Sequence, residues 1–183
     1  MAHVFTTSYL EDAISLLQMY RQLAEGAMAQ VDEEEFFRVS SPEANSIAII
    51  ARHVAGNLRS RWTEFLTSDG EKPWRNRDGE FELPADASRA AVMEDWNLGW
   101  AAVLGAIGAL TEADLARTVA IRGEPHSVLQ AINRALAHSA SHAGQIVLLA
   151  KQCRGERWRT LSIARGQSAE YLRRVQTGAA SQR

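Results

Sequence analysis

The sequence has little of the composition that marks disulfide-rich, membrane or nucleic-acid-binding proteins. It contains one cysteine, so no intramolecular disulfide can form, which fits a reducing compartment. Its 20 Lys and Arg residues nearly balance 22 Asp and Glu residues, and a net charge of −2 gives no electrostatic footprint for nucleic acid or an anionic membrane. Its apolar runs are shorter than the about 20 residues that cross a bilayer, and the N-terminal segment lacks the basic-then-apolar pattern of a secretory signal. We therefore expect a cytoplasmic protein without nucleic-acid or membrane partners.

What the sequence does have is helical periodicity. Apolar residues recur at helical spacing in four long segments. The first extends from about residue 8 to Val31, and the second from a cap at Ser46 to Phe65. The third starts at Asp86 or Ser88 and reaches Ile107, and the fourth covers 127–151. With 183 residues and 46% hydrophobic composition, the chain fits one domain, which we place at 1–176, followed by a frayed tail over 177–183.

The segments between these helices predict the rest of the architecture. The acidic run Asp32–Glu35 is interpreted as a solvated turn, and Gly70–Pro84 as a long loop, a kind of segment that is often functional. Residues 117–122 predict a brief strand that breaks at Gly123–Pro125, and Ser168 predicts the cap of a short last helix. The expected fold is all-α: a four-helix bundle with a long loop between helices 2 and 3, a short strand or hairpin before helix 4, and a C-terminal extension.

Three histidines lie on or beside the apolar stripes of two predicted helices. His138 and His142 are four residues apart, so they point the same way from the middle of the fourth helix's stripe, and His53 lies beside Ile50 and Val54 on the second. Neutral imidazole is a good ligand for zinc, nickel, copper or iron. Three protein ligands leave a coordination position open, as a catalytic metal needs.

A structural interpretation competes with the metal site. A lone His-x-x-x-His pair often arises by chance, and buried imidazoles can be satisfied by a carbonyl or a hydroxyl. The pair also lacks the glutamate of the zincin motif, since residue 139 is Ser. Spacing alone leaves both interpretations open.

Two motifs nevertheless resemble those of a known group. Residues 46–57, with His53 and Gly56-Asn57, are similar to the second helix of DinB-like proteins, and His138–Ile146 resembles their His-x-x-x-His-x-Gly-Gln-Ile motif. Residues 61–81 are similar to one branch of that superfamily, carried as a family of unknown function. Residues 161–168 resemble the tail of the same branch, although Ala164 stands where a proline is expected. The resemblance covers about residues 8–175.

The resemblance implies an up-down-down-up bundle, a homodimer, and a metal site of His53, His138 and His142. Zinc or nickel is the expected ion, with iron or manganese as alternatives. The superfamily includes thiol-dependent transferases, which use low-molecular-weight thiols such as bacillithiol or mycothiol, as well as hydrolase-like members, so a small-molecule ligand is expected.

Three functions follow as hypotheses. The first is a metal-dependent enzyme that activates a thiol or water, the second a non-catalytic metal-containing stress-response or binding module, and the third a helical dimer with core histidines and no metal. No residue is assigned a catalytic role. The candidate supporting or substrate-binding residues are Asn57, Arg61, Gln145, Trp74 and Arg75.

Overall fold

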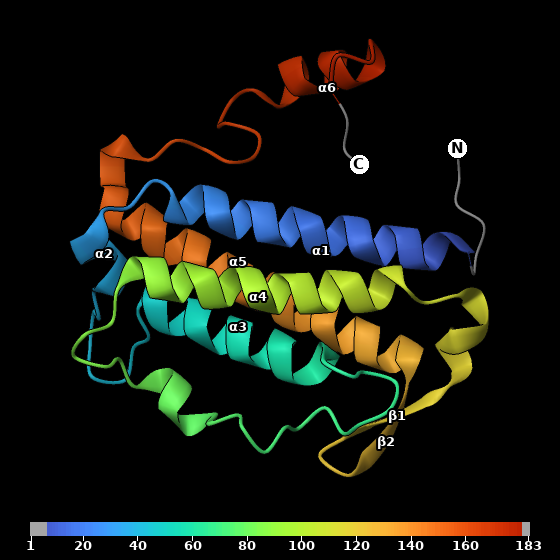
Figure 1. Ribbon diagram of the computed structural model, residues 1–183. Coiled ribbons are helices and arrows are strands. Elements are labelled where there is room, and N and C mark those ends of the chain that lie inside the picture. The colour runs from blue at the N-terminus through green and yellow to red at the C-terminus, as the bar shows by residue number, and fades with distance from the viewer. Residues whose placement is uncertain (1–6, 181–183) are drawn as a thin grey trace.

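The computed structural model describes residues 7–180, and this part of the chain is mostly helical (Figure 1). It contains six α-helices: α1 (Thr7–Met28), α2 (Glu33–Phe37), α3 (Ile47–Trp62), α4 (Arg89–Gly108), α5 (Val128–Arg154) and α6 (Ser168–Gln176). One antiparallel hairpin, β1 (Thr118–Ile121) and β2 (Glu124–Ser127), precedes α5. Short 3-10 turns lie at Asp78–Phe81, Glu112–Ala116 and Gly155–Arg157. Of the tail predicted to be frayed, residues 181–183 lie outside the described range.

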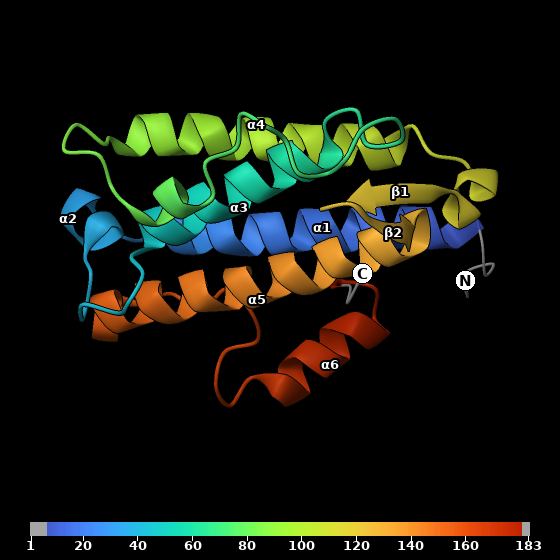
Figure 2. The ribbon, with the colours of Figure 1, turned by 90° about the horizontal axis from the view of Figure 1, so that it is seen from below.

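The four long helices run side by side, with α1 and α5 in one direction and α3 and α4 in the other (Figures 1 and 2). The most extensive contacts are those of α3 with α4 and of α1 with α5, while α3 and α5 touch less. The core between them holds fully buried apolar side chains from every long helix, among them Leu17, Leu58, Trp96, Trp100, Ile132 and Ile146. The four predicted helical segments are therefore confirmed. The first ends at Met28, three residues before the predicted Val31.

Serine caps fix the starts of three long helices. The hydroxyl of Ser46 accepts a hydrogen bond from the Ile49 amide at 3.2 Å, and Ser88 caps α4 in the same way. Ser127 forms a reciprocal capping box with Gln130 at the start of α5. Each bond satisfies an amide that the first helical turn leaves free. The predicted caps are confirmed, with Ser88 rather than Asp86 beginning α4.

The interpretation of Asp32–Glu35 as a solvated turn was wrong. These residues begin the helix α2, which Asp32 caps, and the Glu35 side chain is buried. Its carboxylate accepts hydrogen bonds from Arg154, the last residue of α5, at 3.0 Å and from Arg157, in the 3-10 turn that follows, at 3.4 Å. A buried carboxylate is tolerated because these arginines compensate its charge.

The predicted break at Gly123–Pro125 was too long. The turn of the hairpin consists of Arg122 and Gly123, which both have positive φ, of 57° and 75°. Two such residues form the two-residue turn whose twist matches an antiparallel pair. Glu124 and Pro125 instead belong to β2, and Pro125 pairs with Ala120. A proline is acceptable there because the sheet has only edge strands.

The long loop between α3 and α4 is anchored at two places. The Asp69 carboxylate accepts hydrogen bonds from the backbone amides of Glu71, Arg122 and Gly123 at 2.6–2.8 Å, which ties the loop to the hairpin turn. Farther along, the 3-10 turn at Asp78–Phe81 packs against α3 and carries the buried side chain of Glu80. The loop therefore brings its middle section against α3.

The C-terminal extension ends in α6, which buries none of its residues and lies outside the layer formed by α1 and α5 (Figures 1 and 2). The predicted cap Ser168 is the first residue inside this helix, and Gln167 occupies the cap position without a side-chain hydrogen bond. Among the described residues, no helix combines the length and apolarity needed to cross a membrane.

Candidate metal centre

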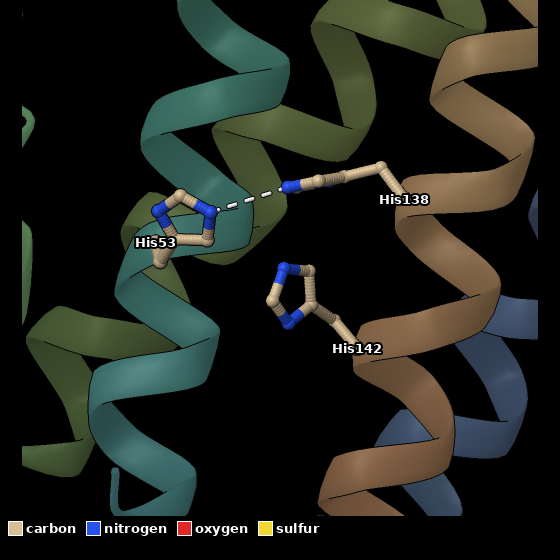
Figure 3. Close-up of side chains that lie close together, drawn as sticks. All are labelled: His53, His138 and His142. Atoms are coloured by element: carbon tan, nitrogen blue, oxygen red, sulfur yellow. Dashed lines mark hydrogen bonds between the residues drawn. The ribbon is translucent and has the colours of Figure 1, made fainter. Parts of the chain in front are cut away.

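The three predicted histidines come together between α3 and α5. His53 projects from α3, and His138 and His142 project from successive turns of α5 toward it (Figure 3). One ring nitrogen of each lies within 4.8 Å of the other two, and the Nε2 atoms of His53 and His138 are 3.2 Å apart. The site is thus built by two helices that are neighbours in space but 85 residues apart in the chain at their closest histidines.

A carboxylate from the long loop orients the His53 ring. The Nδ1 of His53 lies 2.9 Å from Oε2 of Glu80. Because a carboxylate can only accept, Nδ1 carries the hydrogen and Nε2 keeps its lone pair. Arg75 donates to both oxygens of the same carboxylate, at 2.7 and 2.9 Å, and its side chain is only 2% exposed. Burial raises the pKa of Glu80, but the hydrogen bonds from His53 and Arg75 outweigh it, so this pKa lies below its usual value.

An amide orients the second ring in the same way. The Nδ1 of His142 lies 2.8 Å from Oε1 of Gln145, one turn farther along α5. The amide oxygen is an acceptor, so Nδ1 again carries the hydrogen and Nε2 is left with a lone pair. Hydrogen bonds from the distal ring nitrogen to a carboxylate or carbonyl are the usual way in which proteins fix metal-binding histidines.

The arrangement can hold a divalent cation. The Nε2 atoms of His53 and His138 lie at hydrogen-bond distance (Figure 3), so either a hydrogen carried by one of them or a cation lies between the two rings. Two nitrogens at the 2.0–2.1 Å typical of zinc would be about 3.3 Å apart in a tetrahedral site, close to the separation of His53 and His138. Burial, aided by the neighbouring His142 and His53, lowers the pKa of His138 to about 3. Burial also lowers the pKa of His142, so these rings are neutral near pH 7, as ligands must be.

Gly56 allows the loop carboxylate to reach α3. A Cβ atom at this position would lie 2.1 Å from Oε1 of Glu80 and 2.8 Å from its carboxyl carbon. Any other residue would therefore push Glu80 away from His53. This contact gives a physical reason for glycine three residues after the histidine.

A cavity of about 310 Å³ opens beside His138. Its apolar wall includes Trp62, Phe65 and Ile121, and the rings of Trp62 and Phe65 lie 4.3 Å apart. The polar residues that line it are Asn57, Arg61, Arg134 and His138, and no lining residue is acidic. The predicted candidates Asn57 and Arg61 thus lie beside the histidines on the side of the hairpin, on the same face of α3 as His53.

Arg61 is the most constrained of these polar residues. Its Nη2 lies 3.5 Å from Glu71, whereas its Nη1 is buried without a hydrogen-bond partner. Burial is the largest cause that lowers the pKa of Arg61, and Glu71 opposes it. Nearby arginines, including Arg134, lower this pKa further, so positive charge is in excess at this end of the cavity.

The other loop candidates occupy different positions. Trp74 is 52% exposed and lies under the guanidinium of Arg59, 5.1 Å from ring centroid to Cζ. It lines a separate polar cavity on the outer side of Glu80 rather than the one beside His138. Arg75, a candidate for a supporting or a substrate-binding role, is engaged by Glu80, the carboxylate that contacts His53.

Two residues of the site were absent from the sequence-based candidates. Glu80 lies in a loop with no periodic pattern, so nothing local distinguishes it from the acidic residues around it. Arg134 had a usable signal, because it precedes His138 by four residues and therefore shares its helical face.

Comparison with family models shows which protein family the chain belongs to. Residues 4–167 match the model of a family described as "Protein of unknown function (DUF1572)". The chain belongs to this family. The match covers α1 to α5 and the loop that carries Glu80, so the DUF1572 assignment includes every residue of the centre described above. A search of curated proteins gives no match to this chain.

Proposed function

We propose that this DUF1572 protein holds a divalent metal ion through His53, His138 and His142 and is a metal-dependent enzyme. The observation that carries the proposal is the convergence of three ring nitrogens within 4.8 Å, with the distal nitrogens of His53 and His142 fixed by Glu80 and Gln145. A merely structural histidine has no need of a buried Arg–Glu pair dedicated to its tautomer. Zinc and nickel suit three imidazoles best, with iron and manganese as alternatives.

The proposal extends to the fold and its superfamily. We propose that the four long helices form the up-down-down-up bundle of DinB-like proteins, supported by the directions of α1, α3, α4 and α5 (Figure 1). A cytoplasmic homodimer is part of the same proposal and rests on the resemblance alone.

The chemistry proposed for the open coordination position is thiol activation. A thiol coordinated by a metal is deprotonated outright and becomes a nucleophile for an electrophilic substrate. The residues around the cavity support this route, because none of those that line it is a carboxylate able to act as a separate base. His138 lines the cavity, Asn57 offers a neutral hydrogen-bonding group there, and Trp62 and Phe65 form an apolar wall. Activation of water is the alternative within the same enzyme class.

Elemental analysis of the purified protein tests the metal. We expect about one equivalent of a divalent ion per chain in the wild type and a loss of most of it in the His53→Ala/His138→Ala/His142→Ala variant. Equal metal in both proteins would refute the proposal. A Glu82→Gln variant is a suitable control, because Glu82 is an exposed loop carboxylate two residues from Glu80.

The reaction is tested separately on metal-loaded protein. Consumption of low-molecular-weight thiols is followed with a panel of electrophiles, and the His variant is the blank. Metal-dependent thiol consumption would support the transferase. Metal-dependent hydrolysis without a thiol would show that the metal activates water instead. No activity in either assay, with a full complement of metal, would favour a non-catalytic module.

A further inference from the structure

The cavity beside His138 contains an unusual polar feature. It is lined on one side by Arg61 from α3 and on the other by Arg134 from α5, with no acidic lining residue between them. The two helices run in opposite directions (Figure 1), so residues that follow His53 in α3 lie beside residues that precede His138 in α5. Arg61 and Arg134 are therefore brought together at the end of the cavity toward the hairpin.

The protein balances the charge of these arginines only in part. The nearest carboxylate, that of Glu71, is 3.5 Å from Arg61 but only 2.8 Å from Arg122, which binds it more closely. In the described part of the chain Arg134 forms no ion pair, and Nη1 of the largely buried Arg61 has no hydrogen-bond partner. A buried guanidinium donor without an acceptor is costly, and an anionic ligand in the cavity would supply the missing acceptor.

The remaining surface of the cavity indicates the size and polarity of the ligand's body. Trp62 and Phe65 form an aromatic wall with Ile121 beside it, and the volume of about 310 Å³ is at the low end for small-molecule sites. Arg134 lies one helical turn, about 6 Å along the axis, from His138. A ligand held at the arginines therefore extends along the apolar wall toward the histidines.

We propose that this cavity binds a small organic carboxylate, whose charged group is held by Arg61 and Arg134 and whose apolar body lies against Trp62 and Phe65. A carboxylate matches the planar fork of a guanidinium, and the apolar wall excludes a bare inorganic anion as the best ligand. Only the orientation of the ligand rests on the proposed function, because the end of the ligand away from the carboxylate is taken to lie next to the metal centre.

Binding of benzoate, compared with its neutral isostere benzamide, tests the proposal by calorimetry or ligand-observed NMR. We expect benzoate to bind at least about tenfold more tightly than benzamide to wild-type protein, as a charge-assisted hydrogen bond allows. Arg61→Met should weaken benzoate binding by about tenfold, and the more exposed Arg134→Met by about two- to fivefold. Both variants should weaken benzamide binding by no more than about twofold, because only a neutral hydrogen bond is lost. Arg173→Met, which removes the same charge from the exposed helix α6, is the matched control.

Metal removal separates this proposal from the previous one. Benzoate binding to chelator-treated wild-type protein should stay within about twofold of that of the metal-loaded protein if the arginines hold the carboxylate. Loss of binding on metal removal, together with no effect of either arginine variant, would show that benzoate coordinates the metal and would overturn the proposal. Equal affinity for benzoate and benzamide would overturn it as well. A metal-free wild type that still prefers benzoate would refute the metal enzyme and leave the carboxylate site standing.

The carboxylate can belong to the electrophile or to the thiol of the proposed reaction. Competition against benzoate by thioglycolate and by glycolate, the matched carboxylate without a thiol, distinguishes the two in metal-loaded protein. Thioglycolate that competes at least about tenfold better than glycolate assigns the carboxylate to the thiol, and equal competition by both assigns it to the electrophile.

Discussion

At the scale of single residues, the Glu80 carboxylate determines which nitrogen of His53 faces the centre. Glu80→Gln removes the charge that Arg75 and His53 share, while it keeps the size of the side chain. We expect the affinity for zinc to fall about 10- to 100-fold, the range found when groups that orient metal ligands are changed. A chelator-competition titration measures it. Glu82→Gln should bind zinc like the wild type, and equal affinity in all three proteins would contradict the role of Glu80.

Gly56 offers a second test of the same contact, made from the opposite side. Gly56→Ala places a methyl group where Oε1 of Glu80 lies, 2.1 Å from the new Cβ, so the carboxylate must move away from His53. We expect weaker zinc binding, as for Glu80→Gln. Gly144→Ala is the control, because that glycine, two residues after His142, has no atom within 4 Å of the added Cβ. If Gly56→Ala binds zinc normally, the loop carboxylate is not required.

The histidine cluster and two residues of its support, Gln145 and Arg75, were predicted from the sequence, whereas Glu80 was not. His138 and His142 are related by one helical turn, and His53 lies beside an apolar stripe, so local periodicity was enough to propose them. Glu80 depends on the path of the loop between α3 and α4, which no periodic pattern encodes. Arg134 could have been predicted from the same helical projection that identified His138, because it lies four residues before that histidine on the same face.

At the scale of elements, Gly99 sets how closely α4 approaches α3. A Cβ on Gly99 would lie 2.7 Å from the carbonyl oxygen of Ala55 and 3.0 Å from its Cα, and this backbone lies two residues from His53. Gly99→Ala should lower the free energy of unfolding by about 1–3 kcal/mol through overpacking. Gly105→Ala on the same helix meets nothing within 4 Å and should stabilise the protein by about 0.5–1 kcal/mol. Denaturant unfolding measures both, and equal effects would contradict the close packing.

The connection between the long loop and the hairpin should depend on pH. Backbone hydrogen bonds, first from Glu71 and then from Gly123, hold the pKa of Asp69 below its usual 3.8. A lowered folded-state pKa stabilises the structure above the unfolded value, and this contribution is lost as pH falls through the folded value. Exchange protection of the Arg122 and Gly123 amides should therefore decrease below about pH 4, and Asp69→Asn should weaken it already at pH 7. Unchanged exchange protection in the Asp69→Asn variant would contradict the role of Asp69 in joining the loop to the hairpin turn.

Elements with local signals were predicted well, and those with distant partners were not. Ser46, Ser88 and Ser127 lie directly before their apolar stripes, so their capping roles are encoded within four residues. The short helix at Glu33–Phe37 is an exception, because its local signal, the capping box of Asp32 and Glu35, was overlooked. Only the contact of the buried Glu35 with Arg154, 119 residues away, lies beyond the reach of local sequence. The C-terminal helix was predicted, but it starts at Ser168 itself, one residue earlier than a cap at Ser168 implies, and Gln167 in the cap position makes no side-chain hydrogen bond.

At the scale of the whole molecule, the helices associate as two closely packed pairs, α1 with α5 and α3 with α4. The histidines and the adjacent cavity lie where α3 of one pair meets α5 of the other, a less extensive contact. A metal ion bound by both helices would therefore join the two pairs in addition to any chemistry it supports. The cavity lies at this same junction, so the ligand site and the stability of the assembly are expected to be coupled.

Thermal unfolding with and without zinc tests this coupling. A ligand that binds only the folded state adds about 4 kcal/mol when its free concentration is a thousandfold above Kd. For a chain of this length that corresponds to a rise in Tm of roughly 8–16 °C. Magnesium, which prefers oxygen ligands, should have little effect, and the variant lacking His53, His138 and His142 should not respond to zinc. An equal rise in the variant would place the zinc elsewhere, whereas a rise confined to the wild type would show that the folded protein binds zinc through these histidines and that the bound ion stabilises the junction of α3 and α5.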